Sequence, residues 1–257
     1  MVELGLGARA VLSAGGRGVV AATFARAAYL RLPAGLVALV APEVHSGPIH
    51  VRAPVPIDRL ANGDRVTVDD RWLRAGPVAL DLAGATVWLG PLPSPAELAA
   101  SAPLALELLD AGPPSALSAP EFRSRADRAA ASVAGHDLRA ARDALAGLGP
   151  GLTPAGDDVL AGVLLVERAG RGEAAEAALV DLAGGARTND VARAFLTWAA
   201  RGQSIEPVHR FLTAAAGQDG VRARDALRSL SAVGHSSGAD LALGVRLALR
   251  AVVAPVA

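Results

Sequence analysis

The chain has 257 residues, and its 25 basic side chains, all of them Arg, balance 25 Asp and Glu, so the formal net charge at pH 7 is zero. A neutral chain offers no basic field to attract nucleic acid or anionic lipid. A chain of this length can form one large domain or two modest ones. The absence of Cys excludes disulfides, thiolate metal sites and a cysteine nucleophile, and the absence of Lys excludes Schiff-base chemistry.

The apolar stretches are too interrupted for a membrane span. Residues 19–40 are the most apolar, but Arg26, Arg31 and Pro33 break them before the roughly 18 clean apolar residues that a spanning helix needs. Residues 1–16 also lack the basic and then apolar pattern of a signal peptide. We therefore expect a cytoplasmic protein with neither membrane nor nucleic acid as a partner.

The first part of the sequence has the pattern of short strands. Apolar residues alternate with polar residues or prolines at 49–57, where the prolines indicate an edge strand, and again at 65–68 after the turn pair Asn62-Gly63. Two more short apolar runs follow. Several short strands at close spacing predict a barrel- or sandwich-like β-rich domain, which we assign to residues 1–93.

A helical period replaces this alternation from about Pro95 onward. Residues 94–120 contain Pro and Ser clusters and are assigned to a connector, and residues 121–257 are assigned to an α-helical domain. The sequence therefore predicts an α+β protein. The helical stripes that support this reading run along residues 122–133, 138–148, 191–198 and 208–215.

The stretch GLGPGLTPAGDD, residues 147–158, is more heavily specified than a helix connection requires. Thr153 is predicted as an N-cap with Pro154 as the first helical residue, which places Asp157 and Asp158 in the first turn. Helix capping alone explains Thr153, Pro154 and one Asp, but neither the second Asp nor the alternating glycines. Those glycines, which would let the chain approach a ligand closely, are Gly147, Gly149 and Gly151.

The two carboxylates limit what this loop could bind. The stretch is similar to a phosphate loop as far as Gly156, but it continues with Asp157 and Asp158, which would repel a bare phosphate. Either a cation such as Mg²⁺ bridges them, or they accept hydrogen bonds from the N–H groups of a ligand. We expect no histidine-ligated metal, because the five histidines show no familiar ligand spacing.

A second helix start, GHSSGAD at residues 234–240, carries another polar set. Ser237 and Asp240 have the spacing of a capping box, so much of this motif has a structural explanation. His235 and Ser236 are not needed for capping. A neutral imidazole beside hydroxyl groups could carry a proton or contact a ligand, whereas a Ser-His-Asp triad is a weak proposal for such close neighbours.

Glycines one turn beyond the carboxylates connect these two helix starts. Gly162 follows Asp158 by four residues and Gly244 follows Asp240 by four, so each pair lies on one helical face. We predict that the two helices cross closely at these glycines, with their acidic ends side by side.

A third helix start lies in ARTNDVARAFL, residues 186–196. Thr188 or Asn189 is a natural N-cap and Asp190 suits the first turn, so capping alone can explain these residues. Together with the other two starts they could form a third wall of a pocket. Arg187 is the cation that we expect to bind an anionic ligand, because guanidinium binds carboxylate or phosphate in a fork.

These three motifs, in this order, resemble the AllH family. The likeness is concentrated in residues 147–162 and 188–244 and is fainter in VALDLAGATVWLGPL and the strands before it. Ala155 stands where such proteins often carry Ser, so a hydroxyl group is not required there. The resemblance implies a subunit of the oxamate carbamoyltransferase of anaerobic allantoin breakdown, which interconverts oxalurate plus phosphate with oxamate plus carbamoyl phosphate. It also implies an acyl-CoA-synthetase-like subunit and a further subunit as partners.

On this reading, Asp157, Asp158 and His235 are the expected catalytic residues. Carboxylates would accept N–H donors of a carbamoyl or ureido group, and helix amides with an Arg would bind phosphate or carboxylate. Two other functions stay open: a non-catalytic partner-docking subunit, and a free-standing metabolite-binding protein. The expected substrate-binding residues are Gly149, Gly151, Thr153, Arg187, Thr188, Asn189, Ser236, Ser237 and Asp240.

Overall fold

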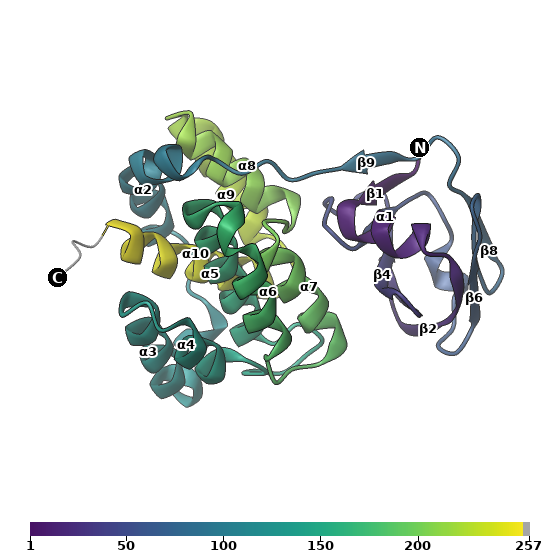
Figure 1. Cartoon of the computed structure of the whole chain (residues 1–257), viewed down its shortest axis with the longest axis horizontal. Helices are drawn as coiled ribbons and strands as arrows, with labels where there is room; N and C mark the ends of the chain where they lie inside the picture. Colours follow the sequence, from purple (N-terminus) through teal and green to yellow (C-terminus); the bar gives the residue numbers. More distant parts are fainter. Residues whose placement is uncertain (254–257) are drawn as a thin grey trace. The chain divides into compact units, whose positions relative to one another are not determined.

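The computed structural model describes residues 1–253 (Figure 1). In its first unit, Met1–Leu89, the strands form one curled nine-stranded sheet. The strand order is β8-β7-β6-β2-β3-β4-β5-β1-β9; β1 and β9 pair in parallel, as do β4 and β5, and the other pairs are antiparallel. The strands are β1 (Glu3–Gly5), β2 (Gly16–Phe24), β3 (Ala27–Leu32), β4 (Gly35–Val40), β5 (His50–Arg52), β6 (Arg65–Val68), β7 (Trp72–Ala75), β8 (Val78–Asp81) and β9 (Thr86–Trp88).

The core of this unit is aliphatic. A helix that the sequence pattern did not reveal, α1 (Leu6–Ser13), packs against β1, β4, β5 and β9 and buries Val11 and Leu12 among Leu, Val, Ile and Ala side chains. The strand predicted at 65–68 is confirmed as β6, whose Val66 and Val68 point into this core.

The strand predicted at 49–57 is shorter than expected and is not at an edge. It is reduced to β5, which lies between β4 and β1 inside the sheet. Pro54 and Pro56 follow it, and because proline has no N–H to donate to a neighbouring strand, the strand ends before them.

The second unit, within Gly90–Ala257, is helical. Its central pair is α5 and α10, which pack side by side in the middle of the unit (Figure 1). The helices are α2 (Pro95–Asp110), α3 (Pro120–Ala134), α4 (Leu138–Leu145), α5 (Ala155–Arg171), α6 (Glu176–Gly184), α7 (Asp190–Ala200), α8 (Glu206–Ala216), α9 (Gly220–Ser231) and α10 (Ser237–Val253), with short 3₁₀ turns at Ala116–Ser118 and Glu173–Ala175. A further 3₁₀ turn, Ile57–Arg59, belongs to the sheet unit.

The close crossing of α5 and α10 is confirmed. A Cβ atom on Gly162 would lie 2.3 Å from the carbonyl oxygen of Leu241, and one on Gly244 would lie 1.9 Å from that of Val159. Both distances are well inside van der Waals contact, so only glycine lets the two backbones approach this closely.

These units confirm the predicted α+β class, with a barrel-like first part and a helical second part. The finer division at residues 93 and 120 remains a proposal. Within 94–120, the segment assigned to a connector, lie α2 and a capping box in which Ser94 and Glu97 exchange hydrogen bonds. Among the described residues, no helix is both long and apolar enough to cross a bilayer.

Candidate functional site

The loop before α5 uses the conformational freedom of its glycines. Gly147, Gly149 and Gly151 all have positive φ, at 66°, 107° and 99°. A Cβ atom on Gly147 would lie 2.8 Å from the carbonyl oxygen of Arg187, so this glycine allows the loop to pack against the backbone that precedes α7.

Thr153 does not cap α5, contrary to the prediction. The helix begins at Ala155 with Pro154 as its N-cap residue, and the amides of Asp157 and Asp158 donate to the Pro154 carbonyl at 2.8 and 3.2 Å. Because these first-turn amides are already satisfied, the Thr153 hydroxyl is free to lie 3.2 Å from the Ser237 hydroxyl at the start of α10.

Asp157 ties three segments together. Its side chain is buried at 2 % exposure; Oδ1 accepts from the Gly147 amide at 3.1 Å and Oδ2 from the Thr188 hydroxyl at 2.5 Å. Burial raises the pKa of Asp157, and the bonds from Thr188 and Gly147 and the charge of Arg193 partly oppose this rise. The carboxyl group therefore joins the glycine loop to the segment before α7.

The start of α7 is capped by Asn189, one of the two predicted candidates. Its Oδ1 accepts from the amides of Val191 and Ala192 at 3.0 Å each, and its Nδ2 donates to the carbonyl of Leu152 at 3.0 Å. Arg193, which the sequence reasoning missed, donates from Nη2 to the Thr188 carbonyl at 2.7 Å. Arg193 thus holds the backbone of Thr188, and Asn189 joins the start of α7 to the glycine loop.

The predicted capping box between Ser237 and Asp240 is wrong. Asp240 is fully buried, and its Oδ1 accepts instead from the Ser115 hydroxyl at 2.5 Å and from the Ala116 amide at 2.8 Å. The sequence reasoning missed Ser115, which lies 125 residues away in the segment assigned to a connector. In the sequence, Ser115 is recognisable only as part of a Pro-Pro-Ser turn, and a turn motif does not identify a distant hydrogen-bond partner.

Asp158 lies at the centre of these contacts. Burial raises its pKa well above the ordinary value; the nearby carboxylates of Asp240 and Asp157 raise it further, and hydrogen bonding with Ser237 and Thr153 lowers it. Among the described residues, Oδ2 of Asp158 and Oδ2 of Asp240 are buried atoms without a hydrogen-bond partner. Together these side chains form what we call the helix-start cluster: Thr153, Asp157, Asp158, Thr188, Ser237 and Asp240.

Other predicted site residues lie outside this network of contacts. Arg187 and His235 are exposed, and Ser236 is half-buried and contributes its carbonyl oxygen, which accepts from the Asp240 amide at 2.9 Å. Gly149 and Gly151 shape the loop. In residues 1–253, no group of three or more His, Cys, Asp or Glu side chains is placed to hold a metal ion.

A family model described as oxamate carbamoyltransferase subunit AllH matches residues 145–249. This part of the chain is AllH-like. The match contains all three helix starts and confirms the resemblance to AllH, which supports a subunit of oxamate carbamoyltransferase. Comparisons with curated proteins and with solved structures found no match. Ser115, the partner of Asp240, lies outside the matched AllH region.

Proposed function

We propose that this chain is a cytoplasmic subunit of a carbamoyltransferase acting on oxalurate and oxamate, or on a related small ureido or amide compound. The helix-start cluster would bind the carbamoyl group. The observation that carries the proposal is the pair of buried oxygens, Asp158 Oδ2 and Asp240 Oδ2, that lack a hydrogen-bond partner. Such atoms are costly in a folded protein unless a ligand or an ordered water satisfies them.

The chemistry of a carbamoyl group suits this cluster. The group presents N–H donors and a carbonyl acceptor, and a protonated carboxyl group presents one donor and one acceptor. The raised pKa of Asp158 favours that protonated form. Asp158 Oδ2 would therefore direct its proton at the nitrogen that leaves the carbamoyl carbon, while Asp240 Oδ2 accepts an N–H of the carbamoyl group.

The transfer step requires a proton at the departing nitrogen. In the direction from oxalurate, a phosphate oxygen attacks the carbamoyl carbon, the bond from that carbon to the oxamate nitrogen breaks, and this nitrogen takes up a proton. Asp158 would supply the proton as a general acid and recover one from the phosphate hydroxyl. Backbone amides at Gly149 and Gly151 would stabilise the developing oxyanion.

The remaining predicted roles are part of the same proposal. Arg187 would bind the anionic end of a ligand, and the exposed His235 would exchange protons with solvent. The acyl-CoA-synthetase-like subunit and a further subunit would complete the enzyme, with Mg²⁺ as an optional cofactor. The AllH match supports a multi-subunit assembly through the description of that family as a subunit.

The test uses the complex reconstituted with its partner subunits. Asp158→Asn should lower the turnover of oxalurate by about 100-fold, the lower end of what a general acid contributes. Asp157→Asn should lower it less, because Asp157 already has partners for both oxygens. Asp181→Asn is the matched control: Asp181 is exposed, and its ion pair with Arg139 is 3.7 Å long, so turnover should not change.

A binding measurement separates the competing functions. Oxalurate at a hundredfold excess over its dissociation constant should stabilise the isolated chain by about 2.7 kcal/mol. Unchanged stability with oxalurate, oxamate and carbamoyl phosphate, together with tight binding to a partner subunit, would replace the proposal with a docking function. Wild-type turnover in both Asp157→Asn and Asp158→Asn would remove the proposed catalytic roles.

A further inference from the structure

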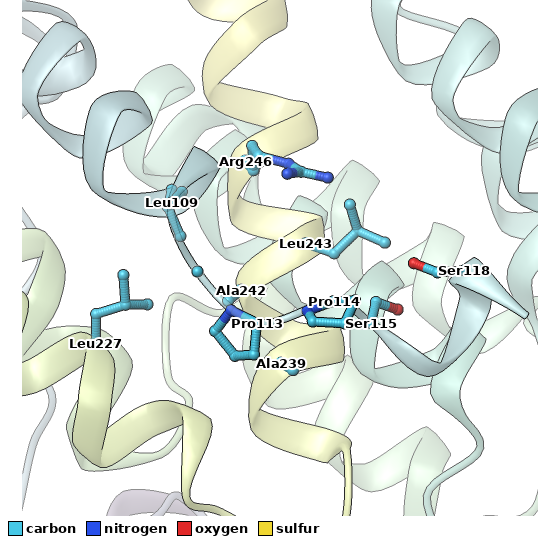
Figure 2. Close-up of a pocket in the computed structure, with 11 residues that line it drawn as sticks. Leu109, Pro113, Pro114, Ser115, Ser118, Leu227, Ala239, Ala242, Leu243 and Arg246 are labelled. Atoms are coloured by element: carbon cyan, nitrogen blue, oxygen red, sulfur yellow. The ribbon is translucent and has the colours of Figure 1, made fainter.

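A cavity of about 260 Å³ lies between the end of α2, residues 112–118, α9 and α10 (Figure 2). Leucine, alanine and proline side chains make up most of its wall. The polar side chains that line it are Ser115, Ser118 and Arg246, and among these lining residues Arg246 is the charged one. The cavity therefore has a mixed lining, in which apolar side chains alternate with polar atoms, and one cation lies in its wall.

Arg246 has hydrogen-bonding capacity left over. Its Nε is buried without a partner among the described residues, and its Nη1 lies 3.6 Å from Asp110 Oδ1. That same oxygen accepts a 2.6 Å hydrogen bond from Arg250. Because one carboxylate faces two guanidinium groups, a positive charge remains at the cavity.

The two serines differ in what they can offer a ligand. Ser115 donates its single proton to Asp240 and accepts from the Leu117 amide at 3.0 Å, so it has no proton left for the cavity. Asp240, which accepts this proton, is not among the residues that line the cavity. Ser118 is exposed, and Figure 2 shows its hydroxyl directed toward α10, the helix that carries Arg246.

We propose that this cavity binds a small organic carboxylate. The carboxylate would bind Arg246 and Ser118, and the organic part would contact Leu109, Ala242 and Leu243. Guanidinium matches the geometry of a carboxylate, whereas inorganic phosphate would leave oxygens unsatisfied against leucine side chains. A cavity of about 260 Å³ is below the usual range for drug-sized ligands, so the ligand has few non-hydrogen atoms. This inference does not rest on the proposed function of the helix-start cluster.

Calorimetry on the full chain with propionate, propionamide and inorganic phosphate tests the inference. Propionate should bind at least tenfold more tightly than either propionamide, its neutral counterpart, or phosphate. Arg246→Gln should weaken propionate binding at least tenfold. Arg224→Gln is the matched control: it removes the same charge from an exposed position on α9, the helix that contributes Leu227 to the cavity, and should bind as the wild type does.

A second variant keeps the test decisive if Arg246→Gln does not fold. Ala242→Leu fills the cavity from its apolar wall without changing charge, and should also weaken propionate binding at least tenfold. Equal propionate binding by wild type and a folded Arg246→Gln or Ala242→Leu variant would overturn the inference. Equal binding of propionamide, tighter binding of phosphate, or no binding of propionate would do the same.

Discussion

At the scale of single residues, the carboxyl group of Asp158 links stability to pH. Its pKa is raised in the folded state, so the folded chain holds this proton more tightly than the unfolded chain does. The stabilising contribution is complete below the unfolded pKa near 3.8 and is lost as pH rises through the folded pKa. Asp158→Asn removes this dependence and should become more stable than the wild type as pH rises toward 8.

Urea unfolding of both proteins from pH 4 to pH 8 measures this effect. The difference in the free energy of unfolding between variant and wild type should increase with pH, and the effects of titrating groups that do not interact with Asp158 cancel in the difference. Two curves that stay parallel over the whole range would contradict a raised pKa at Asp158.

His209 should show the opposite behaviour. Its Nε2 accepts from the Ser204 amide at 2.9 Å, and its Nδ1 lies 3.0 Å from the Pro91 carbonyl, to which it donates in the neutral form. Burial lowers its pKa from 6.5 to about 4. Its contribution, about 3 kcal/mol for a shift of this size, is complete above pH 6.5 and is lost as pH falls through about 4.

An NMR titration of the His209 imidazole checks this prediction directly. The ring should remain neutral at pH 5.5 and titrate near pH 4. A midpoint near 6.5 would show that burial and the two hydrogen bonds do not hold the neutral form.

The site residues that sequence could identify are those with a helix-start signature. Asp157, Asp158, Asp240 and Asn189 were all singled out because capping residues and first-turn acids have a local pattern. Ser115 has no such pattern, because its role depends on a hydrogen bond to a residue 125 positions away. Thr153 was assigned to the wrong partner for a related reason: its hydroxyl binds Ser237, 84 positions away, rather than its own helix.

At the scale of helices, the crossing of α5 and α10 leaves no room for a methyl group. Gly162→Ala and Gly244→Ala should each destabilise the helical unit by at least about 2 kcal/mol, because the new Cβ would press on backbone atoms that cannot rotate away. Gly184→Ala is the matched control. Gly184 is an exposed residue of α6 with nothing within 4 Å of an added Cβ, so alanine should be neutral or slightly stabilising.

Thermal or urea unfolding of the three variants decides this prediction. Similar stabilities for all three would mean that the helices can separate at little cost. Since the helix-start cluster depends on the same crossing, Gly162→Ala should also weaken any ligand bound there.

The apolar periodicity of the sequence predicted some helices and missed others. Strongly periodic stretches became α3, α4, α7 and α8, whereas α2 was hidden by an internal proline, Pro103, and by the Pro and Ser residues around it. A proline inside a helix usually indicates a break, and here tertiary packing of the buried face of α2 overrides that preference.

At the scale of the whole molecule, the chain has two separate hydrophobic cores. All buried residues of the sheet core precede residue 81, and all those of the helical core follow residue 97. A fragment that begins at Gly90 should therefore fold without the sheet unit. Circular dichroism and thermal unfolding of this fragment should show a helical protein with one cooperative transition.

A shorter fragment that begins at Ser94 provides the control. Gln203 exchanges hydrogen bonds with both backbone groups of Gly90, and His209 donates to Pro91, so removing residues 90–93 leaves buried polar groups without partners. The shorter fragment should be less stable by about 1–3 kcal/mol for each buried polar group that is left without a hydrogen-bond partner. Equal stability of the two fragments would contradict this role for Gly90 and Pro91.

The hydrogen bond from the Gly147 amide to Asp157 gives the chain a spectroscopic indicator of its own. The NMR resonance of a backbone amide that is hydrogen-bonded to a carboxyl oxygen shifts when that oxygen gains a proton, moves or accepts a different donor. Isotope labelling of glycine alone would therefore follow titration and occupancy of the carboxylates in solution, without a dye, a tag or a substitution in the protein.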